Sequence, residues 1–214
     1  DHTLRILPHG NWKKGNEIPV MVYADFPEAE LFLNGRSLGR QKKQPYTIPS
    51  GTAEQTKSLV ETKALLRRYR LIWDTVKYEP GELCVVAYDA EGRPAMEKTM
   101  RTAGAPAALK LEADRTAIKA GGDDLSFITV SMLDSRGTLC PDVSDKVTFS
   151  VSGAGTLRGL CNGDPTSIES FLASEMHLFH GQLVLVVQSS SQKGSIRIEA
   201  TSGSMSSTIE ISVE

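Results

Sequence analysis

A polar loop within Arg158–Phe171, RGLCNGDPTSIESF, has side chains that could bind an ion. Asn162, Asp164 and Glu169 carry the oxygens that calcium prefers, although the D-x-D-x-D-G spacing of a calcium loop is absent. A phosphate site would need backbone amides at a helix N-terminus, and Pro165 removes one amide. We therefore expect a structural turn whose side-chain oxygens satisfy loop amides, with calcium as the alternative. The turn comprises Asn162, Gly163, Asp164, Pro165, Thr166 and Ser167.

Two histidines, His177 and His180, have a spacing that could hold a metal ion. The surrounding sequence, HLFHG, is more typical of a loop before a strand, with Phe179 as the core anchor. We favour that loop and keep a metal as the alternative.

No pair of carboxylates has the context of a glycosidase site, where two must face one cleft. Glu28 and Glu30 share a strand face and Asp123-Asp124 are adjacent, so we assign these pairs to solvated surface and to a turn. The motifs of serine hydrolases, P-loops and dinucleotide-binding folds are also absent. The sequence therefore predicts no catalytic residue and no cofactor.

Sugar-binding surfaces usually expose aromatic side chains, and aromatic residues make up only 6% of this chain. Trp73, within RLIWDTV, is expected in a core. Trp12, in the loop PHGNWKKG, either stacks on a ligand or covers a sheet edge, and we favour the structural role.

The 214 residues include 40% hydrophobic and 23% charged residues, an ordinary globular composition. A net charge of −2 gives no basic surface for nucleic acid, and no apolar run reaches the ~18 residues of a membrane span. We expect Cys84, Cys140 and Cys161 to be buried thiols, with a Cys140–Cys161 bridge as the alternative. The start at Asp1, with no leader-like segment, indicates a piece of a longer protein.

Alternating apolar residues between turn residues predict strands throughout. Those of the first half are Thr3–Leu7, Ile18–Ala24, Ala29–Leu33, Ser37–Gln41, Tyr69–Thr75, Glu82–Asp89 and Met96–Thr102. Those of the second half are Leu109–Ala113, Phe127–Leu133, Lys146–Val151, Thr156–Leu160, Leu183–Gln188, Ser195–Ala200 and Ser207–Val213. Asn34-Gly35 predicts a hairpin, and Thr102–Ala108 predicts a flexible linker. The prediction is an all-β chain of two tandem immunoglobulin-like β-sandwich domains, 1–104 and 105–214.

The segment Gln41–Arg70 interrupts this pattern. Thr52–Gln55 fits a capping box, and helix formers fill Ala53–Arg68. Because the apolar face is thin, we expect a short helix or a mobile surface loop inserted into the first domain. A lid or docking arm is the functional alternative.

The first half contains LRILPHGNWKKGNEIPVMVYADFPEAELFLNGRSLGR, YEPGELCVVAYDAEGRP and KTMRTAGAPAALKLEADR. The second half contains DRTAIKAGGDDLSFITVSMLDSRGTLCPD, VTFSVSGAGTLRGLCNGDPTSIESF and FHGQLVLVVQSS. Together these stretches resemble the region after the catalytic barrel of glycoside hydrolase family 2 enzymes, in particular large β-galactosidases of the Bacteroides type. His9, Asn11 and Trp12 match a His-Trp-Asn-Trp stretch of the family and are the candidate carbohydrate contacts. Gly10 replaces its first Trp, which weakens a stacking role.

The resemblance implies that the acid/base and nucleophile glutamates lie on an upstream barrel. This chain would then be a non-catalytic C-terminal fragment of a retaining β-galactosidase or β-glycosidase, bracing the enzyme and shaping its cleft or an oligomer interface. Its partners would be the barrel and other domains of the parent chain, which would supply the contact with a β-galactoside or polysaccharide. A periplasmic or secreted location is also implied. The alternatives are a carbohydrate-binding module and cell-surface immunoglobulin-like adhesion domains.

Overall fold

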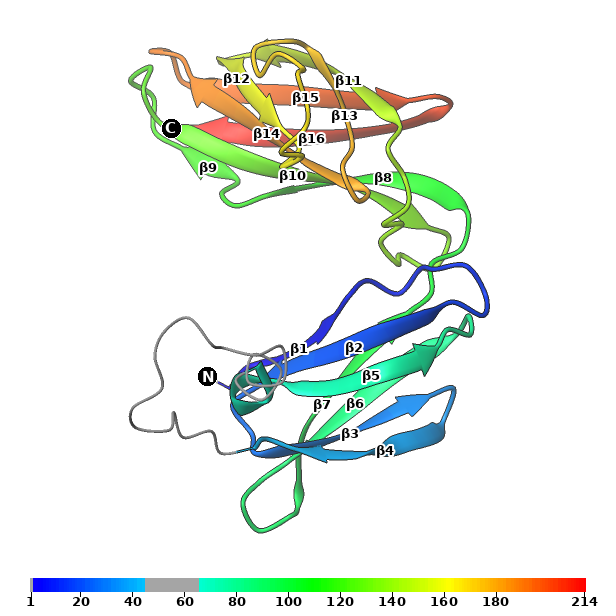
Figure 1. The fold of residues 1–214 in the computed structure, drawn as a ribbon. Coiled ribbons are helices and arrows are strands. Elements are labelled where there is room, and N and C mark those ends of the chain that lie inside the picture. The colour runs from blue at the N-terminus through cyan, green and yellow to red at the C-terminus, as the bar shows by residue number, and fades with distance from the viewer. Residues whose placement is uncertain (1, 45–65) are drawn as a thin grey trace, which may run out of the picture. The chain divides into compact units, whose positions relative to one another are not determined.

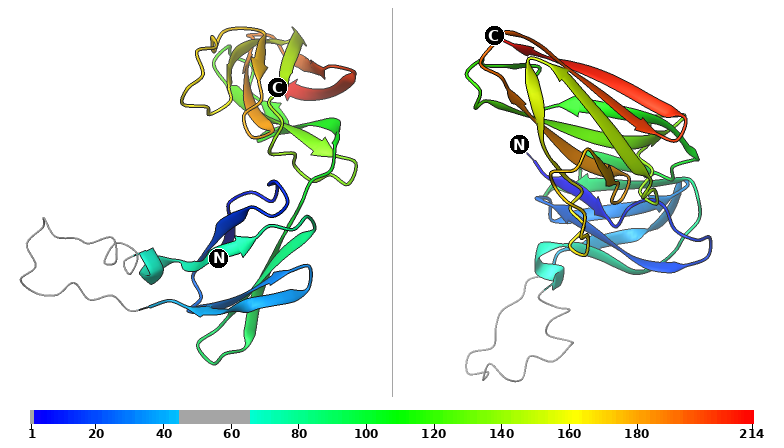
Figure 2. Two further views of the ribbon diagram at one scale, coloured as in Figure 1. Left: turned by 45° about the vertical axis from the view of Figure 1, so that its right-hand side comes forward. Right: turned by 90° about the horizontal axis from the view of Figure 1, so that it is seen from above.

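A computed structural model describes residues 2–44 and 66–214, and the chain divides into two compact units (Figure 1). The first unit is Asp1–Thr102 and the second is Ala103–Glu214. Each unit consists of two sheets, in which nearly all strands pair antiparallel (Figure 2). The two sheets of a unit enclose one hydrophobic core. The predicted all-β architecture of two sandwiches is therefore confirmed.

The first unit has a three-stranded and a four-stranded sheet. The three-stranded sheet has the order β1 (Leu4–Leu7), β2 (Glu17–Ala24), β5 (Leu71–Lys77). The four-stranded sheet has the order β4 (Arg36–Lys42), β3 (Glu28–Leu33), β6 (Glu82–Tyr88), β7 (Pro94–Arg101). Asn34 and Gly35 join β3 to β4 with φ of 51° and 78°, which confirms the predicted hairpin.

The core of the first unit follows from the alternation along its strands. In β3, Ala29, Leu31 and Leu33 point inward because their side chains lie two residues apart. Trp73 on β5 belongs to the same core, as predicted, and its indole N–H donates to the Gly39 carbonyl at 3.0 Å.

The second unit has a four-stranded and a five-stranded sheet. The four-stranded sheet has the order β12 (Gly155–Cys161), β14 (Gln182–Ser189), β10 (Leu125–Asp134), β8 (Pro106–Ala113). The five-stranded sheet has the order β13 (Glu175–His177), β11 (Lys146–Gly153), β15 (Gly194–Ser202), β16 (Met205–Val213), β9 (Ala117–Ile118). The short β9 pairs with β16 in parallel, whereas the other strands pair antiparallel.

Several local predictions need correction. Pro106–Ala108, expected in a flexible linker, are the first residues of β8. Phe179 was expected to anchor the core, but Leu178 is the buried residue because it shares an inward face with Met176. All three cysteines were expected to be buried, but Cys84 is half-buried and Cys161 is an exposed free thiol, and only Cys140 is buried.

The predicted helix over Ala53–Arg68 falls mostly outside the described residues. Within them, 66–69 form one helical turn, which takes in Tyr69 from the predicted strand. No helix of the described residues is long and apolar enough to cross a membrane.

One carboxylate connects the first residues of the second unit to the rest of that unit. Asp134 accepts hydrogen bonds of 2.8 Å from the backbone amides of Gly104, Arg136 and Thr138. The bond from Gly104 and then that from Thr138 lower the pKa of Asp134 to about 2. The chain is therefore ordered from Gly104 onward, where a flexible linker was expected.

Candidate functional sites

The first candidate site is the Trp12 loop, which we define as residues 9–12 between β1 and β2. The rings of His9 and Trp12 stack, with centroids 4.9 Å apart and an interplanar angle of 5°. The Trp12 indole N–H donates to the His9 carbonyl at 2.9 Å, and the Asn11 amide donates to His9 Nδ1 at 3.4 Å. The structure thus brings the three candidate sugar contacts together, and their polar groups bond to one another.

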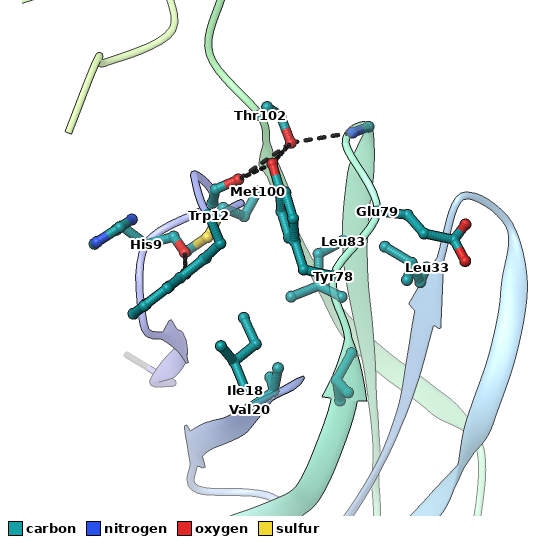
Figure 3. A pocket seen from close by; sticks show the side chains of 13 residues that line it. His9, Trp12, Ile18, Val20, Leu33, Tyr78, Glu79, Leu83, Met100 and Thr102 are labelled. Carbon is teal, nitrogen blue, oxygen red and sulfur yellow. Dashed lines mark hydrogen bonds between the residues drawn. The ribbon is translucent and has the colours of Figure 1, made fainter. Parts of the chain in front are cut away.

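Two side chains from distant strands hold the middle of this loop (Figure 3). The Tyr78 hydroxyl donates to the Gly10 carbonyl at 3.0 Å and lies 2.9 Å from Thr102 Oγ1. The Thr102 hydroxyl also lies 3.1 Å from the Gly10 carbonyl oxygen. The Gly81 amide donates to the Thr102 hydroxyl oxygen at 3.0 Å. The loop is therefore fixed against the strand ends by uncharged groups.

Gly10 packs directly against β7. A Cβ atom added to Gly10 would lie 2.9 Å from the Arg101 carbonyl oxygen and 3.2 Å from Met100 Cγ. A larger residue at this position would therefore require the backbone to move.

A small cavity lies beside the loop, with His9, Trp12, Ile18, Val20, Tyr78 and Met100 among its walls (Figure 3). Its volume is about 30 Å³, enough for about two water molecules. With the open mouth included, the space between its walls is about 360 Å³. His9 and Ile18 lie on opposite sides of the Trp12 ring, and Trp12 is 37% exposed. A sugar ring would therefore rest at the mouth, against a ring with neighbours on both faces. Carbohydrate contact by His9, Asn11 and Trp12 stays the alternative to the structural role that we favour for Trp12.

The second candidate site is the Asp164 loop, which we define as residues 162–169 after β12. Asp164 Oδ1 accepts hydrogen bonds of 2.8 Å from both the amide and the hydroxyl of Thr166. Asn162 Oδ1 accepts the Asp164 amide, and Asn162 Nδ2 donates to the His177 carbonyl, each at 3.0 Å. Gly163 has φ of 78°, the left-handed conformation that glycine adopts without strain. Side-chain oxygens thus bond to the loop's own amides.

Glu169 links this loop to β13. Its Oε1 lies 2.8 Å from His177 Nδ1, and its carboxylate also accepts the His177 amide at 3.3 Å. Burial alone would raise the pKa of Glu169, but the hydrogen bonds and charge of His177 outweigh it and lower the pKa. Hydrogen bonds from Thr166, first its amide and then its hydroxyl, lower the pKa of Asp164. Both carboxylates are thus stabilised in the ionised form by protein donors.

The two histidines of HLFHG have different partners. His177 pairs with Glu169, whereas His180 Nδ1 lies 3.3 Å from the Pro141 carbonyl. Within residues 2–44 and 66–214, no group of three or more His, Cys, Asp or Glu side chains is placed to hold a metal ion. The structure therefore adds no support to the metal or calcium alternatives.

The carboxylates of β3 are also occupied. Glu28 pairs with Arg40 at 2.9 Å and with Lys42. Glu30 accepts hydrogen bonds from the hydroxyls of Ser37 at 2.5 Å and Tyr88 at 3.2 Å. Arg40 lies over the Tyr88 ring, 3.5 Å from its centroid. These contacts connect side chains of β3, β4 and β6 to one another on the outer face of the sheet.

Sequence reasoning missed Tyr78 and Thr102 as the partners of the Trp12 loop. Tyr78 opens the stretch YEPG, and Thr102 lies in RTAG. Both stretches contributed to the family resemblance, so the available signal was their co-occurrence with the His9–Trp12 stretch.

Two family models match the chain. Residues 109–209 match "Glycoside hydrolase family 2 C-terminal domain 5". Residues 15–96 match a "Domain of unknown function".

Three glycosidases are similar to this chain. The chain is 36% identical over 99% of its length to the beta-galactosidase BoGH2A of Bacteroides ovatus, and it covers 22% of that protein. A beta-glucuronidase of Formosa agariphila is 26% identical over 77% of this chain, which covers 15% of it. The crystal structure of a glycosyl hydrolase family 2 member from Bacteroides cellulosilyticus superposes with a TM-score of 0.82. The two are 33% identical over 97% of this chain and 24% of that one. The chain therefore spans about a fifth of the length of BoGH2A.

Proposed function

We propose that this chain, which belongs to the C-terminal region of glycoside hydrolase family 2 enzymes, is a non-catalytic accessory region of a longer glycosidase. The observation that carries the proposal is the match to BoGH2A over 99% of this chain but only 22% of that β-galactosidase. Domain 1–104 would follow a catalytic barrel, and domain 105–214 would be the C-terminal sandwich.

The candidate loops support a structural role. In the Trp12 loop, the hydroxyls of Tyr78 and Thr102 bond to the Gly10 carbonyl. In the Asp164 loop, the carboxylates of Asp164 and Glu169 bond to groups of the chain itself. A catalytic carboxylate pair needs a shared cleft, whereas Glu28 and Glu30 are engaged on an outer sheet face. We infer that these domains brace the parent enzyme and contribute to the rim of its cleft or to an oligomer interface.

The proposal extends to partners and location. The partners would be the catalytic barrel and other domains of the same polypeptide. The substrate would be a β-galactoside or a related β-glycoside, hydrolysed elsewhere in the parent chain with retention of configuration. The location would be periplasmic or extracellular, where polymeric glycans are encountered.

Glycosidase assays on two proteins test the proposal. The longer natural polypeptide and the isolated 214-residue chain would each be incubated with chromogenic aryl β-galactosides and β-glucuronides. We expect the longer polypeptide to hydrolyse one of these and the 214-residue chain to match the buffer blank. Hydrolysis by the isolated chain, or failure of the longer polypeptide on every β-glycoside, would overturn the proposal.

A further inference from the structure

The two outer faces of the second unit differ in chemistry. On the five-stranded sheet, cross-strand pairing defines one row of Ser150, Glu199 and Thr208 and another of Ser152, Arg197 and Glu210. All six side chains are exposed and polar. This is the expected outer face of a sandwich, with one side packed on the core and the other facing water.

The outer face of the four-stranded sheet is apolar at its centre. Pairing places Gly159, Val186 and Phe127 in one row, and Cys161, Val184, Thr129 and Glu112 in the next. Glu112 pairs with Lys110 at 2.8 Å, so the β8 side of this face is charged. Phe127 is 46% exposed, Cys161 is exposed, and the two valines are half-buried. We define the apolar face as Phe127, Cys161, Val184 and Val186.

The border of the apolar face combines polar and apolar side chains. Gln182 and Gln188 belong to the flanking rows, and they donate to Ser131 Oγ at 2.9 Å and to the Gly122 carbonyl at 2.6 Å. At the β12 edge, the Phe171 carbonyl accepts the Leu160 amide at 2.8 Å. Phe171 and the adjacent Leu172 are 62% and 78% exposed. An apolar centre with a partly polar rim is the typical anatomy of an interaction surface.

We propose that the apolar face is the surface through which the second unit docks onto the catalytic part of its own polypeptide. The inference rests on the proposed function, which supplies that part. Relatives extend far beyond the matched region, because this chain covers only 22% of BoGH2A and 24% of the Bacteroides cellulosilyticus enzyme. The docked surface would be an apolar patch of the catalytic part.

A tethered partner fits the size of this face better than a second copy. A stable complex between free proteins buries ~1,200–2,000 Å² and must offset lost translational and rotational freedom. A domain of the same polypeptide is held at an effective concentration of about a millimolar or more, so a smaller apolar contact suffices. The four side chains of the apolar face are a small set, which favours the tethered occupant.

The reactivity of Cys161 reports directly on this face. The 214-residue chain and the longer polypeptide would be labelled with a maleimide, and the rate at Cys161 would be followed by peptide mass spectrometry. Because thiol reactivity depends on access, we expect labelling about tenfold slower or more in the longer polypeptide. Ser150→Cys on the polar face of the same sandwich is the matched control and should react equally in both proteins.

Two variants distinguish docking of the apolar face from a general slowing of Cys161 labelling in the longer polypeptide. Val186→Lys should restore rapid labelling of Cys161 in the longer polypeptide, whereas Thr208→Lys on the polar face should leave it slow. Equal Cys161 rates in the two wild-type proteins would overturn the inference. Protection of the 214-residue chain that grows with its own concentration would overturn it in favour of a second copy. An active glycosidase with unprotected Cys161 would refute this inference alone. An inactive polypeptide with protected Cys161 would refute the proposed function and the catalytic identity of the docked part, while leaving the apolar face as a docking surface.

Discussion

The Trp12 loop and the Asp164 loop are held by different chemistry. The Trp12 loop depends on close backbone packing at Gly10 and on the uncharged hydroxyls of Tyr78 and Thr102. The Asp164 loop depends on the ionised carboxylates of Asp164 and Glu169 at a more exposed surface. The comparison shows that the two loops need different perturbations to open them.

The difference predicts the size of mutational effects. A variant that disturbs packing or leaves a buried polar group without a partner loses the full steric or desolvation free energy. When an exposed ion pair is removed, water replaces the lost contact, so little stability is lost. Changes at the Trp12 loop should therefore destabilise the chain more than changes at the Asp164 loop.

Gly10→Ala should have the largest effect. Its Cβ would lie 2.9 Å from the Arg101 carbonyl, so β7 or the loop must shift, at a cost of about 1–3 kcal/mol in unfolding free energy. Trp12 and Trp73 are the only tryptophans, and both belong to the first unit, so tryptophan fluorescence during urea unfolding reports on it. An unchanged urea midpoint would show that the loop does not pack closely on β7.

Tyr78→Phe should have the next largest effect. Tyr78 is buried, and removing its hydroxyl leaves the Gly10 carbonyl with one bond fewer, so we expect a loss of ~1 kcal/mol by the same unfolding assay. Thr102→Val removes the other hydroxyl, and the double variant should lose less than the sum because the groups share partners. Strict additivity would argue against a connected network.

Glu169→Gln should have a smaller effect. The variant loses the negative charge of the carboxylate that lies 2.8 Å from His177 Nδ1 while retaining a similar shape, and exposed pairs of this kind contribute ~0.2–1 kcal/mol. Because tryptophan is absent from the second unit, the change is best followed by hydrogen exchange of the His177 amide, which donates to Glu169. A loss as large as that of Gly10→Ala would reverse the ranking of the two loops.

Acid should loosen the Asp164 loop selectively. The folded-state pKa of Asp164 is lowered from 3.8, so its stabilising contribution is complete above that value and is lost as pH falls through the lowered pKa. The NMR shift and exchange rate of the Thr166 amide should therefore change only as the pH falls below 3.8. The Gly81 amide, which donates to the Thr102 hydroxyl, is the control and should stay constant until global unfolding. If the signals of both amides changed over the same pH range, the proposed difference between the two loops would be wrong.

The sequence predicted the strands better than the loops, because a strand pattern is local whereas many loop contacts join residues far apart in the sequence. The alternation of Ala29, Leu31 and Leu33 identifies β3 and its buried face locally. The two residues of β9 and the three of β13 are too short for such a pattern, and neither strand was predicted. Inward alternation from Met176 would have selected Leu178 over Phe179 as the anchor.

Contacts between distant residues could not be predicted in this way. Gly10 is separated from Tyr78 by 68 residues and from Thr102 by 92. Nothing in the local sequence pairs these residues, whereas the bond between Asp164 and Thr166 spans only two positions. Reasoning from composition and spacing therefore anticipated the internal bonding of the Asp164 loop and missed the anchors of the Trp12 loop.

The most direct test of the central claim, that both loops are structural and the chain does not act on or bind sugar, is a fluorescence titration. The 214-residue chain would be titrated with β-galactosides and galactan oligosaccharides while the emission of Trp12 and Trp73 is recorded, with Trp12→Phe as the control variant. We predict no saturable change in emission in either protein. Saturable quenching in the wild-type chain that disappears in Trp12→Phe would contradict the account and identify the Trp12 loop as a carbohydrate site.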